Sequence, residues 1–86
     1  MSASTDREDA REAMRQIARV GSHVEINQFL TDLRNDPTRT IRVLTAVLRC
    51  TFRSRDKLPE WIPLFNHIKT TFPELADDYL VGLSVD

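Results

Sequence analysis

The sequence predicts an all-α fold, a compact bundle of four to five short helices. Apolar residues recur at spacings of three and four, capping residues and prolines separate the segments, and no two segments alternate as paired strands do. The 86 residues suit one domain, because domains usually hold about 100–150 residues. The apolar share of 41% and the net charge of −1 favour a folded chain. We expect residues 1–5 to be disordered and residues 6–86 to form one helical domain.

The first helix is expected at about residues 6–20. Thr5 followed by Glu8 is a capping-box pattern at its start, and Gly21 suits the left-handed position after its end. Its buried side is mostly alanine, so it can approach a neighbour closely but contributes little hydrophobic energy. The apolar positions of this segment are Ala10, Ala13, Met14, Ile17 and Ala18.

The second helix is expected at about residues 23–34, and another capping-box pattern, Ser22 with Glu25, marks its start. The spacing of its apolar residues is that of one helical face. These residues are Ile26, Phe29, Leu30 and Leu33.

The third helix is expected at about residues 37–53. Asp36 can cap it, and Pro37 suits the first helical position because its missing N–H has no partner there in any case. Apolar residues cover most of its circumference, which is typical of a central helix. The main face consists of Ile41, Leu44, Val47, Leu48 and Phe52, and the far side adds Val43, Ala46 and Cys50.

Two further segments, about 59–72 and 73–81, complete the bundle. Pro59 and Pro63 cannot both lie deep in one helix, because proline lacks an N–H and clashes with the preceding turn. Either both prolines lie in the first turns, or a short turn precedes a helix that opens at Pro63. Another proline opens the last helix, which we expect Gly82 to end.

Charge is divided unevenly along the chain, with a net of +5 over residues 37–57 and −4 over residues 58–86. At about 100° per residue, four arginines share an arc of roughly 80° on the third helix. The stripe has four interpretations: a solvated face, a pairing with the acidic C-terminal third within the chain or on a second copy, a contact with another protein, or a site that binds phosphates. Nucleic acid is the least favoured partner, because no aromatic residues are interleaved with the stripe and helix-turn-helix signals are absent. The arginines of this stripe are Arg39, Arg42, Arg49 and Arg53.

The fourth segment is apolar over about 160°, which is wider than the stripe of about 100° that faces a core. Trp61, flanked by prolines, is either a core residue or an interface anchor. Leu80 falls off the apolar face of the last helix, so a partner is one candidate to cover it. We predict Trp61, Phe65 and Leu80 as apolar anchors.

The C-terminal residues alternate in hydropathy, and this pattern predicts a short extended tail after the last helix. The tail has three interpretations: it covers its own core, adds as a strand to another chain, or frays. The alternating apolar positions are Tyr79, Val81, Leu83 and Val85.

The sequence favours neither catalysis nor a cofactor. Its histidines, His23 and His67, and its single Cys50 have no spacing typical of a catalytic or metal site. We expect Cys50 to be a buried, inert thiol. The N-terminus has no apolar segment typical of a secretory signal, and the longest apolar stretch is too short to span a membrane. We therefore expect a cytoplasmic protein with no cofactor and no metal.

Taken together, these features predict a small non-catalytic protein-interaction module, such as an adaptor, an inhibitor, or an assembly or regulatory subunit. Its partner is another protein or a second copy of the chain. The apolar anchors and the arginine stripe are the expected contacts. The alternative is a nucleic-acid-binding module that uses the arginine stripe of the third helix.

Overall fold

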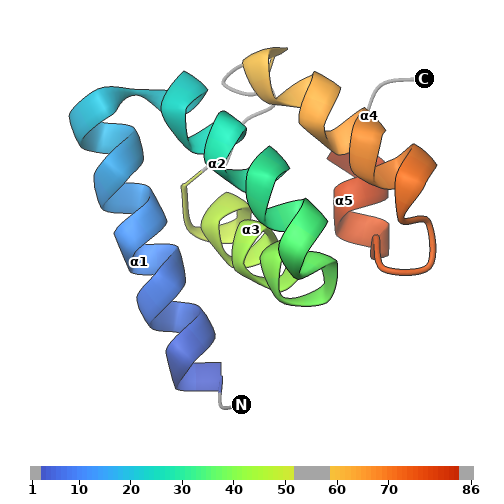
Figure 1. The fold of residues 1–86 in the computed structure, drawn as a ribbon, viewed down its shortest axis with the longest axis horizontal. Helices are drawn as coiled ribbons and strands as arrows, with labels where there is room; N and C mark the ends of the chain where they lie inside the picture. Colours follow the sequence, from blue (N-terminus) through green and yellow to red (C-terminus); the bar gives the residue numbers. More distant parts are fainter. Residues whose placement is uncertain (1–2, 52–58, 84–86) are drawn as a thin grey trace.

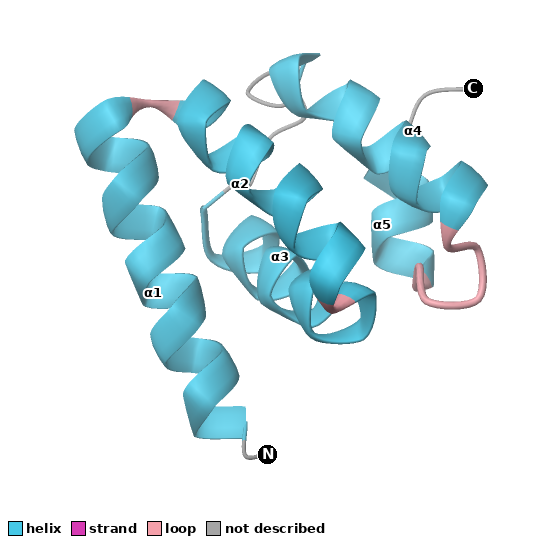
Figure 2. Cartoon of the chain, viewed as in Figure 1, coloured by secondary structure: helices cyan, strands magenta, loops and turns pink. Residues whose placement is uncertain are grey.

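The described part of the chain is built from helices and contains no strand. The computed structural model describes residues 3–51 and 59–83. Short loops join the helices, as Figure 2 shows. The all-α bundle is therefore confirmed. In chain order the elements are α1 (Ala3–Val20), α2 (Ser22–Asn35), α3 (Pro37–Thr51), a 3-10 turn η2 (Pro59–Trp61), α4 (Ile62–Thr71) and α5 (Asp78–Leu83).

Two groups of helices share one core. The helices α1, α2 and α3 pack against one another, and α4 packs against α5 and η2, with η2 also touching α2 (Figure 1). Trp61 lies where the groups meet, with its ring centroid 6.2 Å from that of Phe29 and 6.5 Å from that of Phe65. The core includes buried apolar residues from all five helices. The region where α1, α2 and α3 meet therefore lies on one side of α2 and α3, and α4 lies on the other side.

The helix α1 begins at Ala3, earlier than predicted, so residues 3–5 are helical rather than disordered. Thr5 lies inside the helix and is not its cap. Asp6, in the first turn, suits the positive end of the helix dipole and also pairs with arginines of α3, which holds this turn on the bundle. Gly21 has φ of 100° and ends the helix as predicted. The apolar pattern held for Ala10 and Ala13, which are buried, but Ala18 is exposed.

The predicted capping box of α2 does not form. The helix begins at Ser22, and its cap position is occupied by Gly21, so Ser22 lies one residue too far into the helix to cap it. Glu25, the other half of the pattern, is buried.

The predicted start of α3 is confirmed. The helix begins at Pro37, and the backbone N–H of Arg39 donates to Asp36 Oδ1 over 3.2 Å. The prediction that Cys50 is buried is wrong, because its thiol is exposed. Cys50 follows the buried Leu48 by two positions, which is about 200° around the helix.

The segment that begins at Pro59 has the second of the two proline arrangements, in which a short turn precedes the helix. The turn η2 holds Pro59, and α4 then opens at Ile62 with Pro63 in its first turn. The last helix starts later than predicted, at Asp78, because residues 73–75 form a turn. Asp77 Oδ1 accepts a hydrogen bond of 2.9 Å from the N–H of Leu80, which caps α5.

The predicted extended tail is wrong for the residues that the structure describes. Tyr79 to Leu83 are helical, and α5 continues through Gly82. Leu80 is 2% exposed and Leu83 packs against the core, whereas Val81 is 41% exposed. The hydropathy pattern of this segment is therefore that of a helix whose Leu80 and Leu83 side chains face the core. Val85 lies outside the described residues.

Candidate functional site

The three predicted apolar anchors are core residues. Trp61 is 0% exposed, Phe65 is 1% exposed and Leu80 is 2% exposed, so none offers apolar surface to a partner. The broad apolar face of α4 explains this result. It packs against η2 and against α5, so its apolar surface is covered within the chain. The prediction of surface anchors is corrected accordingly.

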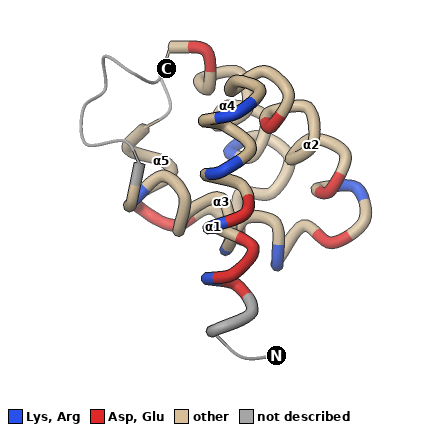
Figure 3. The backbone as a smooth tube through the Cα atoms, turned by 90° about the vertical axis from the view of Figure 1, so that its left-hand side faces the viewer, with Lys and Arg blue, Asp and Glu red and all other residues tan. Residues whose placement is uncertain are grey.

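The first half of the arginine stripe pairs with α1. Arg39 forms ion pairs with Asp9 and, over 3.9 Å, with Asp6. Arg42 Nε donates to Asp6 Oδ2 over 3.2 Å. Acidic and basic positions lie side by side where α1 crosses α3 (Figure 3). These guanidinium groups are therefore neutralised by carboxylates of the same chain.

Further along α3, Arg49 lies against the acidic C-terminal third. Its Nη2 is 3.6 Å from Asp77 Oδ2, and its guanidinium carbon is 4.4 Å from the centre of the Tyr79 ring. Arg42 and Arg49 line a shallow groove of about 360 Å³ against the turn before α5. Arg53, the fourth predicted contact, lies outside the described residues. The three described arginines therefore form ion pairs within the chain, and the pairing of the stripe with the acidic C-terminal third is found at Arg49.

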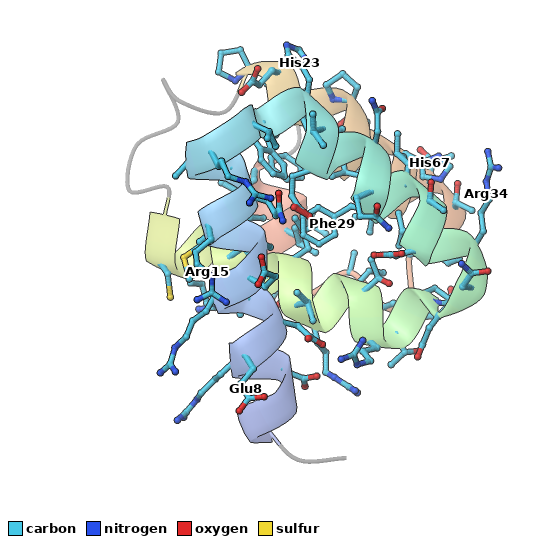
Figure 4. The ribbon with its side chains drawn as sticks, turned by 60° about the vertical axis from the view of Figure 1, so that its left-hand side comes forward. Glu8, Arg15, His23, Phe29, Arg34 and His67 are labelled. Carbon is cyan, nitrogen blue, oxygen red and sulfur yellow. The ribbon has the colours of Figure 1, made fainter. Side chains whose placement is uncertain are left out.

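A second charged region lies where α1, α2 and α3 meet, and we call it the acidic cleft. Its volume is about 370 Å³, and Ala13, Phe29 and Val43 contribute apolar lining. Figure 4 looks toward this side, with Phe29 between the three helices. One arginine, Arg39, also lines it. The carboxylates that define the acidic cleft are Asp9 and Glu12 on α1, Glu25 and Asp32 on α2, and Asp36 at the start of α3.

On α1, the carboxylates of the acidic cleft have partners. Glu12 accepts hydrogen bonds from Arg15 (2.9 Å) and Gln16 (3.3 Å). The hydrogen bond and the charge of Arg15 hold the pKa of Glu12 below its ordinary value. Asp9 is paired with Arg39. The α1 wall is therefore largely compensated.

On α2 and at the α3 start, two more carboxylates are hydrogen-bonded. Asp32 Oδ1 accepts from Gln28 over 3.0 Å, and Asp36 Oδ1 accepts from the backbone N–H of Arg39. Among the described residues, no lysine or arginine forms an ion pair with Asp32, so its hydrogen bond orients the charge without cancelling it.

Glu25 differs from the other carboxylates of the acidic cleft. The residue is 7% exposed, and within residues 3–51 and 59–83 its side chain forms no hydrogen bond or ion pair. Burial raises the pKa of Glu25, and the charges of Asp32 and Glu12 raise it further. A buried carboxylate normally has a hydrogen-bonding partner, so its absence here sets this position apart.

The sequence assigned Glu25 to a capping box and so missed this role. A signal was present, because Glu25 precedes Phe29 by four residues and therefore shares its face of the helix. A carboxylate on the apolar face of a helix indicates a buried charge. The partners on α1 and α3 were not visible, because they depend on how the helices cross.

The other reactive side chains of the described residues are apart from one another. His23 Nε2 is 3.4 Å from Glu60 Oε2, and His67 lies edge-on to Phe72, at 6.3 Å between ring centroids. Cys50 is exposed on α3. Within the described ranges no group of His, Cys, Asp and Glu side chains is arranged to hold a metal ion.

Comparison with protein-family models, with curated proteins and with solved structures gave no significant match. Among the helices of the described residues, none combines the length and apolarity that crossing a bilayer requires.

Proposed function

We propose that the protein is a small, non-catalytic interaction module that binds a basic segment of a partner protein in the acidic cleft. The observation that carries the proposal is a difference in ion pairing between the arginines of α3 and the carboxylates of the acidic cleft. The described arginines of α3 contact carboxylates of the same chain, whereas within the described residues the Glu25 side chain has no partner and Asp32 has no ion pair. The acidic cleft therefore has acceptors left for another molecule.

Electrostatic complementarity supports this choice of partner. A negative concave surface attracts basic segments, speeds their association and disfavours nucleic acid. The alternative of a nucleic-acid-binding module needs the arginine stripe, but Arg39, Arg42 and Arg49 already meet Asp6, Asp9 and Asp77. No observation favours that alternative. The proposal includes a cytoplasmic location, which the single cysteine, unable to form a disulfide within the chain, supports.

The test is affinity capture with two variants of equal charge. Asp32→Lys reverses one charge in the acidic cleft, at the end of α2 where a cation suits the helix dipole. Glu74→Lys makes the same change at an exposed position in the turn before α5. The immobilised wild type and both variants are exposed to nuclease-treated cell extract, and captured proteins are quantified.

The expected result is that wild type and Glu74→Lys retain the same protein, while Asp32→Lys retains at most about a tenth of it, the scale of a close charge reversal. The captured protein should bind directly when purified. Equal retention by all three forms, or loss of the captured material on nuclease treatment, would overturn the proposal.

A further inference from the structure

We propose that the acidic cleft contains a subsite for a single arginine side chain of the partner, with Glu25 as the group that receives the guanidinium. The inference rests on the proposed function and specifies its chemistry. The juxtaposition that carries it is a glutamate, 7% exposed and without a side-chain partner in the described part of the chain, on the wall of a cleft that also has apolar lining.

The position of Glu25 points to a missing partner. Glu25 as a whole is 7% exposed, but its side chain lines the acidic cleft and its oxygens are not among the fully buried polar atoms, so an incoming group can reach them. An unpaired buried charge costs free energy that a cation bound there would recover. A ligand that supplies a positive charge and hydrogen-bond donors therefore complements this site, whereas an anion or an apolar group does not.

The lining favours arginine over a metal ion. Calcium and magnesium require several converging oxygen ligands, and the described carboxylates form no such group. Phe29, Ala13 and Val43 suit the aliphatic stem and flat face of an arginine. Guanidinium is also more weakly hydrated than ammonium and binds carboxylates through two parallel hydrogen bonds.

The size and the surrounding charges agree with one inserted side chain. The volume of about 370 Å³ lies at the small end of the range for ligand clefts, about 300–1,000 Å³. Arg39, the cation within the acidic cleft, is turned to Asp6 and Asp9, and Arg15 is bound to Glu12. Asp32, whose charge raises the pKa of Glu25, adds a second attraction for a cation at the same place.

The experiment uses the full chain and three short peptides, acetyl-Ala-Arg-Ala-amide and its citrulline and lysine analogues. Citrulline keeps the shape of arginine but has no charge. Binding is followed by two-dimensional NMR of backbone amides. The expected result is that the arginine peptide shifts amides around Glu25, Phe29 and Val43, that lysine binds several-fold more weakly, and that citrulline causes no shift.

Matched variants assign the effect to one carboxylate. Glu25→Gln keeps the side chain's shape and should weaken the arginine peptide by about tenfold or more, because a charge-assisted pair is lost. Glu74→Gln, the same change at an exposed position outside the acidic cleft, should leave the dissociation constant unchanged. Unchanged amide spectra elsewhere show that each variant is folded.

Two results would overturn the subsite: arginine and citrulline peptides that bind equally, or a Glu25→Gln variant that binds arginine as tightly as wild type. Either result is compatible with the proposed function if the Asp32→Lys variant still retains much less of the partner protein than wild type in the affinity capture. Conversely, arginine-selective binding without a loss of capture in Asp32→Lys would retain the subsite and reject the proposed function.

Discussion

The arginine stripe of α3, which forms the arginine face of this helix, and the acidic cleft both concentrate charge, but they differ in how far these charges are paired within the chain. On the arginine face, Arg39, Arg42 and Arg49 each have a carboxylate partner from α1 or from the cap of α5. In the acidic cleft, Glu25 has none among the described residues. The difference teaches that an excess of charge along a segment does not locate an available charge. Helix crossings decide which groups are compensated.

The largest expected effect tests whether Trp61 is a core residue. Trp61→Ala removes the ring that contacts Phe29 and Phe65 and should lower the free energy of unfolding by about 3–5 kcal/mol. Urea denaturation measures it, with Val20→Ala, at an exposed position, as the control. A loss below about 1 kcal/mol would mean that Trp61 is not a core residue.

The next prediction concerns the guanidinium groups of the arginine face, which lose a carboxylate partner when Asp6 is changed. Asp6→Asn removes the carboxylate shared by Arg39 and Arg42 and should cost about 1–2 kcal/mol, because the Asp6 side chain is largely buried. The freed guanidinium groups should also raise retention on a heparin column. Glu8→Gln, an exposed change on the same helix, should do neither. Equal behaviour of the two variants would contradict the claim that in-chain pairing neutralises the arginine face.

A third prediction concerns the pH dependence of stability through Glu25. Its pKa is raised by burial, with further repulsion from Asp32 and Glu12, so the folded state holds the proton more tightly than the unfolded state. Stability is therefore lost as the pH rises through the folded-state pKa. Asp9, Asp36 and Arg39 also face the acidic cleft, from α1 and the start of α3.

Glu25→Gln removes this loss and should raise the free energy of unfolding at pH 7 by about 1 kcal/mol. The gain should shrink toward zero as the pH falls below the ordinary glutamate pKa of 4.5. Thermal melts between pH 4 and pH 8 measure it, with Glu74→Gln as the reference. A variant that is less stable than wild type at pH 7 would show that Glu25 has a stabilising partner.

The smallest expected effect is the pairing of Arg49 with Asp77. Both side chains are half-exposed, so a double-mutant cycle should give a coupling of about 0.3–1 kcal/mol, from which the contact of Arg49 with Tyr79 cancels. Arg49→Ala and Asp77→Asn suit the cycle, because asparagine retains the cap of α5. A coupling that does not fall on adding 1 M salt would contradict a surface ion pair.

The fold was predictable where local signals were strong. Gly21 required a left-handed backbone, and Asp36 with Pro37 marked a helix start, so both joins were predicted correctly. The start of α5 was not, because Pro73 suggested a helix and the cap is supplied by Asp77 four residues later. The alternation from Tyr79 to Leu83 is too short to distinguish a strand period from a helical one.

The candidate site was less predictable, because it depends on contacts between helices. The apolar face of α4 looked wider than a core requires, but α5 and η2 cover it. Trp61 and Leu80 are therefore buried. The arginine stripe was recognised on its helix, yet its partners on α1 were not. Glu25 carried a usable signal, its register with Phe29, but the capping-box pattern offered a competing explanation.

The most direct test of the account is the titration of the Glu25 carboxyl by NMR, in the free protein and with the arginine peptide added. The account predicts that the pKa of Glu25 in the free protein lies above its ordinary value of 4.5, and that the peptide lowers it, because a bound guanidinium favours the charged form. An ordinary pKa in the free protein, or a pKa that the arginine peptide leaves unchanged, would contradict the claim that Glu25 is a buried carboxylate awaiting a cationic partner.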